Sequence, residues 1–492
     1  MLFNSLQFLI FFSIVTAAYF ALPHRFRWQL LVIASCYFYM VLVPQYILIL
    51  FFLIIIDYSA GLIIENAEGR KRKFILVLSL IANIGMLGVF KYFNFLNDNL
   101  HGVFNIFGWH YHIGNLSLIL PIGLSFHTFQ SMSYTIEVYR KHYKAEHHLG
   151  IYTLYVLFYP QMVAGPIERP GNLLHQFHEV KLFEYQRVAD GLKQMVWGLF
   201  KKVVIADRLA LFVNAVYNNP ENHNGLSLIL ATYFFSFQIY CDFSGYSDIA
   251  IGAAKVMGIR LMNNFDHPYF AKSITEFWRR WHISLSSWLR DYLFLPISYA
   301  SVRKFDSIRL FKLRANVWAY GTGILVTMFL GGLWHGASYT FIFWGVLHGV
   351  YQIFSHLTQR VRKTISKKIQ LARHPSIEKS IKIIVTFHLV TFAWIFFRAK
   401  SFGDAWYIIT HMFRFHPSDS IWDLGSGKSE MLVAVLALVV METIHVLQRR
   451  QSIIQRLRMQ PAWSRWALYA GAVVLILLFG EFNSLDFIYF QF

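Results

Sequence analysis

The segment from Ala315 to Gln359 constrains the fold most strongly, because it runs for 45 residues without a Lys, Arg, Asp or Glu. A membrane-spanning helix needs about 20 consecutive, mainly apolar residues, so this run is long enough for two. A second run without charge extends from Trp28 to Ile56. Only 14% of the chain is charged, whereas soluble domains carry about 25%. The sequence therefore predicts an integral membrane protein.

Apolar stretches recur along the whole chain, and no soluble domain, internal repeat or low-complexity tract separates them. The sequence predicts an all-α, polytopic membrane protein with about 11–12 transmembrane helices. We expect a single membrane domain over residues 1–492, with the last helix and an aromatic tail at 465–492. The apolar stretches cover residues 5–22, 28–43, 45–64, 74–90, 116–138, 151–164, 226–241, 316–331, 337–358, 382–397, 431–447 and 465–480.

Three segments are expected to differ from simple spans. Residues 116–140 are polar and contain Pro121, which favours a re-entrant segment or one buried against protein. Residues 185–213 and 273–297 place Lys, Arg and Trp between apolar residues at helical spacing. This pattern is typical of amphipathic helices in the membrane interface, with the tryptophans as anchors and the arginines in water or on phosphates.

The basic loops predict the orientation of the chain, because Lys and Arg collect on the cytoplasmic side of a membrane. Five basic loops alternate consistently with the spans if all five are cytoplasmic, and both termini then lie outside. The net charge of +19 fits this distribution, and we find no nucleic-acid-binding motif. The loops are HRFRW (24–28), EGRKRK (68–73), SVRKFDSIRLFKLR (301–314), RVRKTISKK (360–368) and QRRQSIIQRLR (448–458).

His335 is the first candidate for chemistry, since it lies in the glycine-rich sequence FLGGLWHGASYT at 329–340. Ionisable groups at membrane depth are rare and usually functional. A neutral imidazole there can accept a proton from a hydroxyl nucleophile and return it to a leaving group. The glycines allow backbone or a ligand to approach closely. A structural hydrogen bond between helices is the alternative interpretation.

Other candidates carry weaker patterns. His282 follows WRRW and is either a second polar group in the same cavity or an interfacial ring among tryptophans. Tyr489, in the terminal FIYFQF, either anchors the last helix in an aromatic belt or folds back into the bundle. A tyrosyl oxygen, with an ordinary pKa near 10, needs a base before it attacks an acyl group. His348 lies about 20 Å from His335 along a continuous helix and is expected to be structural.

Acidic and sulfur-containing side chains give little support for other chemistry. Asp242 and Asp248, in CDFSGYSDIAIG, could share acid–base work or could hydrogen-bond the backbone within the bundle. Cys36 and Cys241 both lie in apolar stretches, which favours buried thiols over a disulfide. No H-E-x-x-H helix or Cys cluster is present, so we predict no metal site.

The ordered set of motifs resembles the membrane-bound O-acyltransferase (MBOAT) family, in particular its bacterial branch that O-acetylates alginate, other exopolysaccharides and peptidoglycan. The matching stretches are spread over nearly the whole chain, which makes the set specific. They are GVFKYFNF (88–95), LPIGLSFHTFQSMSYTIEVYR (120–140), FYPQMVAGPIERP (158–170), FKKVVIADRLA (200–210), CDFSGYSDIAIG (241–252), ITEFWRRWHISLSSWLRDYLF (274–294), FLGGLWHGASYTFIFWGVLHG (329–349) and FIYFQF (487–492).

The resemblance implies a fold, a donor and roles for three residues. It implies helices in a ring around a tunnel, with acetyl-CoA as a cytoplasmic acyl donor and no permanently bound cofactor. His335 corresponds to the near-invariant family histidine, His282 to a second one, and Tyr489 to a tyrosine proposed to carry the acyl group outward. A periplasmic SGNH-type transferase would then acetylate a polysaccharide or peptidoglycan outside the bacterial inner membrane.

Two other classes of function stay open from the sequence. The acyl group could be another one, such as D-alanine delivered to a teichoic acid-like polymer. Alternatively, the chain could be a transporter of a lipid-linked sugar or acyl donor, or a scaffold for polymer export, without covalent transfer. Polar, broken helices such as 116–140 suit a transporter as well.

Overall fold

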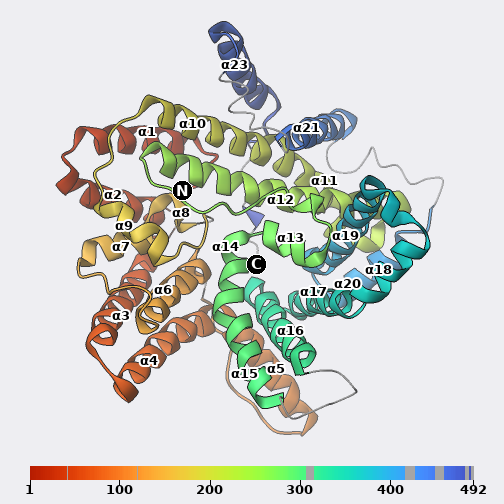
Figure 1. The fold of residues 1–492 in the computed structure, drawn as a ribbon, viewed down its shortest axis with the longest axis horizontal. Coiled ribbons are helices and arrows are strands. Elements are labelled where there is room, and N and C mark those ends of the chain that lie inside the picture. Colours follow the sequence, from red (N-terminus) through yellow and green to blue (C-terminus); the bar gives the residue numbers. More distant parts are fainter. Residues whose placement is uncertain are drawn as a thin grey trace. The chain divides into compact units, whose positions relative to one another are not determined.

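The protein is all-α in the part of the chain that its computed structural model describes, and no strand occurs there (Figure 1). The prediction of an all-α polytopic membrane protein is thereby confirmed. The described residues are 1–41, 43–118, 120–163, 165–305, 315–415, 427–448, 459–482 and 487–488. They fall into two compact units, unit 1 with the described residues of 1–202 and 245–262 and with 482, 487 and 488, and unit 2 with the described residues of 203–244 and 263–481. A single domain over 1–492 stays a prediction.

Unit 1 is built mainly from the first ten α-helices. Its helices α3, α4 and α6 pack on one another, and α2 packs on α1 and α7. The helices are α1 (Leu6–Ala21), α2 (His24–Met40), α3 (Ile47–Asn66), α4 (Gly69–Leu87), α5 (Phe93–Ile106), α6 (Leu124–Tyr139), α7 (Leu149–Leu157), α8 (Tyr159–Met162), α9 (Pro170–His178) and α10 (Tyr185–Leu199), with the short 3₁₀ helix η1 (Pro44–Tyr46) and the π-helix η2 (Gly88–Tyr92).

A buried carboxylate joins two helices of unit 1. Asp57 on α3 accepts hydrogen bonds from the Ser79 hydroxyl at 2.6 Å and from the Asn83 amide at 2.9 and 3.0 Å, both on α4. All three side chains are buried. Polar groups in a membrane protein interior are tolerated when they satisfy one another in this way, so Asp57 has a structural role.

Unit 2 contains most of the later helices. Two elements, η3 (Phe200–Ala206) and the long α12 (Gly225–Val256), contribute residues to both units. The others are α11 (Asp207–Tyr217), η4 (Pro220–Asn222), η5 (Pro268–Phe270), α13 (Ile274–Arg280), α14 (Ile283–Leu289), η6 (Arg290–Phe294), α15 (Leu295–Phe305), α16 (Ala315–His335), α17 (Tyr339–Leu357), α18 (Gln359–Lys368), η8 (Leu371–Arg373), α19 (Pro375–Arg398), α20 (Phe402–His411), α21 (Gly427–Gln448) and α23 (Ala462–Phe479).

The 45-residue run without charge forms the helix pair α16 and α17, which lie side by side in Figure 1. The chain turns between His335 and Tyr339, where the Ser338 hydroxyl caps α17 by accepting the Thr340 N–H at 3.3 Å. Two glycines bring the helices together, since a Cβ on Gly345 would lie 2.1 Å from the Met328 carbonyl oxygen and one on Gly332 would lie 2.3 Å from that of Phe341. Here the glycines serve close backbone packing.

The described residues include seven helices that are long and apolar enough to cross a membrane, and every stretch expected from the sequence coincides largely with helix. Five of the twelve expected stretches are not among these seven. Residues 116–138 and 151–164 contain only the shorter helices α6, α7 and α8, α1 and α2 have only 16 and 17 residues, and α17 is long enough but not apolar enough. The spans are Pro44–Asn66, Gly69–Ile106, Gly225–Val256, Ala315–His335, Pro375–Arg398, Gly427–Gln448 and Ala462–Phe479.

The two segments expected in the membrane interface are buried in protein at several positions. Trp281 and Trp288 are 1% and 3% exposed, so they are core residues and not interfacial anchors. Lys201 and Lys202, in the segment 185–213, are buried as well. Amphipathic spacing alone does not distinguish a helix lying on lipid from one whose polar face is paired inside the protein. The assignment of Trp281 and Trp288 as interfacial anchors is therefore wrong, and an interfacial position of the two segments stays a prediction.

Candidate active site

His335 is the last residue of α16 and is 4% exposed. Aromatic rings from three elements of unit 2 surround its imidazole. The ring centroid lies 5.0 Å from that of Trp334, 5.0 Å from that of Trp344 on α17 and 5.2 Å from that of Phe397 on α19. Edge-to-face contacts of this kind hold a ring in one orientation. The site therefore presents an imidazole at a helix end inside a largely apolar enclosure.

His282 lies at the break between α13 and α14, with a left-handed backbone (φ 42°) that is uncommon for a residue other than glycine. Its side chain is fully buried and makes an edge contact with Phe243 on α12 at 4.5 Å. Strained backbone persists only where the surroundings hold it in place, and it concentrates at functional sites. Burial lowers the pKa of His282 to about 3, so the imidazole is neutral at physiological pH.

The loop before α13 holds this strained residue from both sides. The Asn264 carbonyl oxygen accepts the Ile283 N–H at 2.9 Å, and its side-chain oxygen accepts the Ser284 hydroxyl at 2.7 Å. On the other side, the Asp266 N–H donates to the Arg280 carbonyl at 2.9 Å. These contacts explain why the chain leaves α13 and enters α14 with His282 turned inward.

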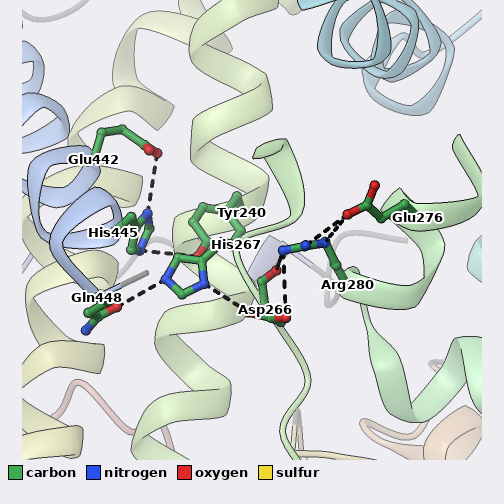
Figure 2. Close-up of polar contacts among 8 residues, drawn as sticks. All are labelled: Tyr240, Asp266, His267, Glu276, Arg280, Glu442, His445 and Gln448. Carbon is green, nitrogen blue, oxygen red and sulfur yellow. Dashed lines mark hydrogen bonds and ion pairs between the residues drawn. The ribbon is translucent and has the colours of Figure 1, made fainter. Parts of the chain in front are cut away.

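Arg280 reinforces the same arrangement through its side chain, as Figure 2 shows. Its guanidinium donates to Glu276 at 2.9 Å and lies 3.7 Å from the Asp266 carboxylate. Arg280 is therefore paired with two carboxylates of the protein and is only partly exposed, while its contact with lipid phosphates stays a prediction. His267, next to Asp266, continues the network to Gln448 on α21 at 3.1 Å.

The structure brings His335 and His282 into one unit, although they are 53 positions apart in the sequence. They share one neighbour, since the indole of Trp334 lies 6.1 Å from the His282 ring and 5.0 Å from the His335 ring between centroids. The sequence analysis missed Trp334, Trp344 and Phe397 as parts of this enclosure. The spacing of Trp344 and His348, one helical turn apart, was the signal that could have found one of them.

His348 lies closer to His335 than the sequence analysis expected. The helix break at 336–338 folds α17 back on α16, so both imidazoles contact Trp344, with centroid separations of 5.0 Å for His335 and 5.1 Å for His348. The expected separation of about 20 Å applies to a continuous helix only. His348 is fully buried among Phe277, Trp278 and Trp344, which agrees with a structural role.

Tyr489 lies outside the described residues, so its position stays a prediction. Two residues immediately before it are described and are buried in unit 1, with Phe487 at 0% and Ile488 at 2% exposure. The Phe487 ring lies 4.4 Å from that of Tyr246 between centroids. The start of the aromatic tail is therefore packed into protein, which favours the fold-back interpretation over an anchor in lipid.

The two aspartates of α12 have different surroundings. Asp248 accepts a hydrogen bond from the buried Lys201 ammonium at 2.6 Å and from the Gln194 amide at 3.0 Å, both within unit 1. Asp242 is buried in unit 2. Six positions apart on one helix, they do not face each other, so a joint carboxylate site receives no support. Among the described residues, no group of three or more His, Cys, Asp or Glu could hold a metal ion.

Comparison with known proteins gives concordant matches. Residues 140–399 match the membrane-bound O-acyltransferase family, MBOAT. The probable alginate O-acetylase AlgI of Pseudomonas aeruginosa is 36% identical over 420 residues, which cover 84% of this chain and 75% of that protein. The peptidoglycan O-acetyltransferase of Helicobacter pylori is 33% identical over 446 residues, covering 84% and 79%. The teichoic acid D-alanyltransferase of Streptococcus thermophilus is 28% identical over 312 residues, covering 60% and 72%.

Proposed function

The chain belongs to the membrane-bound O-acyltransferase family and is a multi-pass O-acyltransferase, and from this premise we propose that it moves acetyl groups from cytoplasmic acetyl-CoA across the bacterial inner membrane. The acceptor is an extracytoplasmic polysaccharide or peptidoglycan. The names of the relatives support this choice, since two of the three are named as a probable alginate O-acetylase and a peptidoglycan O-acetyltransferase. Their matches cover more of this chain than the D-alanyltransferase match does.

His335 acts as the general base and then as the general acid. Its neutral imidazole takes the proton of a hydroxyl group while the hydroxyl oxygen attacks the carbonyl carbon of the thioester. The resulting tetrahedral intermediate collapses, the carbon–sulfur bond breaks, and the imidazolium returns the proton to the leaving thiolate. The products are an acetyl ester and the free thiol of CoA.

The observation that carries this proposal is the burial of His335 at a helix end, inside an aromatic enclosure that also contacts His282 through Trp334. Such an enclosure keeps bulk water from a thioester, which would otherwise be open to hydrolysis. A base whose pKa has fallen to about 3 is weak, so His282 fits hydrogen bonding to the donor or to the intermediate better than proton abstraction.

Replacement of His335 by Gln tests the assignment. We expect acetyl transfer from radiolabelled acetyl-CoA to membrane-associated polymer to fall by about 10²- to 10⁴-fold, the usual contribution of a general base. The matched control is His348→Gln, which removes the other buried imidazole that contacts Trp344. The control should keep most of its activity at an equal protein level. Equal losses in both variants would assign the effect to packing around Trp344 and not to a base.

Tyr489 is proposed as a transient acyl carrier for this reaction. Its phenolic oxygen, once deprotonated by a base, would attack the thioester, release the CoA thiol and hold the acetyl group as an aryl ester until an SGNH-type periplasmic partner removes it. Feeding acetyl-CoA to purified membranes should then add one acetyl group to the C-terminal peptide, as detected by mass spectrometry. A fully active Tyr489→Phe variant would remove this step.

The acyl donor that the protein uses distinguishes acetyl transfer from D-alanyl transfer. Purified membranes are given acetyl-CoA or a D-alanyl carrier protein, and label transferred to polymer is measured. We expect transfer from acetyl-CoA only. Transfer from the D-alanyl carrier alone would overturn the proposed donor while leaving the membership in the acyltransferase family intact.

A further inference from the structure

The turn that carries His282 is held by a neighbouring loop of unit 2, residues 264–267, through two backbone hydrogen bonds of 2.9 Å. This loop ends at His267, whose backbone is left-handed as well, with φ 45°. A second factor opposes that backbone, since His267 precedes Pro268 and a residue before proline prefers an extended conformation. Strained backbone persists only where its surroundings hold it, so the contacts of His267 also bear on His282.

Three groups hold the imidazole of His267 in place (Figure 2). Its Nδ1 lies 3.0 Å from the Asp266 carboxylate, its Nε2 forms a hydrogen bond of 3.1 Å with the Gln448 side chain, and its ring meets the His445 ring edge-on at 4.8 Å between centroids. The Asp266 side chain is 62% exposed, so its contact contributes little. The other two groups belong to α21. His267 therefore attaches the loop to α21.

The partner ring on α21 is itself fixed inside unit 2. His445 is 4% exposed, and its Nε2 lies 3.5 Å from the Tyr240 hydroxyl of α12. Its Nδ1 lies 3.6 Å from the Glu442 carboxylate, one helical turn earlier on α21. Because burial and these neighbours restrict the His445 ring, it gives His267 a fixed surface to pack against.

The middle of the loop packs around the candidate site. The Phe265 ring lies 5.1 Å from that of Phe243 and 5.1 Å from that of Trp281 between centroids. Phe243 in turn meets the edge of the His282 ring at 4.5 Å. A displacement of the loop would therefore loosen both the backbone hydrogen bonds to the turn and the packing around its imidazole.

We propose that His267 is a positioning residue for His282. By attaching loop 264–267 to α21, it keeps the His282 imidazole turned toward Trp334, the neighbour that it shares with His335. His267 acts through His282 and not on the donor. The inference rests on the proposed function, in which His282 hydrogen-bonds the donor or the intermediate. It makes α21, which the sequence marks only as a membrane span, part of the support of the active site.

A change on α21 tests this role while both histidines stay in place. Gln448→Leu removes the hydrogen bond to His267 and should lower kcat/KM for acetyl-CoA by about 10- to 100-fold, since a displacement of about 1 Å at a reacting site can cost 100-fold. Gln448→Glu keeps an oxygen atom for the ring and should restore most of the activity. The matched control is Glu430→Gln, which removes the ion pair between the other end of α21 and Arg208 and should leave kcat/KM unchanged.

A double-mutant cycle separates positioning from general stability. In a His282→Gly background, Gln448→Leu should cause no further loss of kcat/KM, because the side chain that it positions is absent. Additive losses in the double variant would overturn the proposal. An equal loss in the Glu430→Gln control would overturn it too, since any loosening of α21 would then have the same effect.

Hydrogen exchange of the full-length protein distinguishes a failure of this inference from a failure of the proposed function. The peptide that contains Ile283 should exchange faster in Gln448→Leu than in the unmodified protein, because the Ile283 N–H donates to the loop. Unchanged exchange would exclude the positioning role. Faster exchange with unchanged acetyl transfer would support the attachment through His267 and contradict the role of His282 in the reaction.

Discussion

Glu168 is a fully buried carboxyl group in the loop before α9, and its environment links stability to pH. It accepts the Met262 N–H at 2.6 Å and the Asn172 amide at 2.5 Å within unit 1. Burial raises its pKa to about 7, above the ordinary value of 4.5. The folded protein therefore holds this proton between pH 4.5 and 7 while the unfolded chain releases it, and stability falls as the pH rises through that window.

The expected result is a lower unfolding midpoint at pH 8 than at pH 6, corresponding to about 1 kcal/mol from this one group. In a Glu168→Gln variant, which cannot ionise and can keep the hydrogen bond from Met262, the contribution should disappear. Thermal unfolding of both proteins at the two pH values measures it, and the difference between their pH slopes isolates Glu168 from other titrating groups. Identical slopes would contradict the prediction.

At His282, the left-handed backbone and the imidazole can be tested separately. Glycine tolerates φ 42° without strain and alanine does not, so His282→Gly should be more stable than His282→Ala by about 1 kcal/mol. Both variants lack the ring, and both should lose acetyl transfer if the ring contacts donor or intermediate. An active His282→Gly protein would limit this residue to a structural role.

At the scale of elements, the contact between α16 and α17 positions His335 against Trp344. The contact depends on glycine, because a Cβ at Gly345 or Gly332 would approach the facing helix well inside the closest distance that real Cβ atoms show. The neighbouring atoms are backbone carbonyl oxygens, which cannot rotate away as a flexible side chain could. A substitution there must separate the two helices.

Gly345→Ala is therefore expected to destabilise the protein by more than about 2 kcal/mol and to reduce acetyl transfer with it. Gly321→Ala on α16 is the matched control, since its Cβ would lie 3.8 Å from Ile353 and meet no closer atom. Alanine favours a helix over glycine by about 1 kcal/mol, so the control should be neutral or stabilising. The thermal unfolding midpoints of the two variants test this prediction. Equal midpoints would contradict a contact between α16 and α17 that depends on glycine.

At the scale of the whole molecule, hydropathy and charge predicted the helices, because the bilayer requires long apolar runs and leaves few alternatives. His335 and His282 could be predicted as candidates from their unusual setting and from motif resemblance. Their shared contact with Trp334 could not be, since it depends on the strained turn that places His282 against the end of α16. Similarly, amphipathic spacing in 273–297 did not reveal that Trp281 and Trp288 face protein and not lipid.

The basic loops predict the orientation of the chain across the membrane, and this prediction can be measured on intact cells. A background without Cys36 and Cys241 is given one cysteine at a time, at exposed positions where little packing is disturbed. We expect Lys368→Cys on α18 and Lys71→Cys on α4 to react with a membrane-impermeant maleimide only after the membrane is opened, because clusters of Lys and Arg stay cytoplasmic. His112→Cys, in a loop expected outside, should react on intact cells. The reverse pattern would invert the predicted topology.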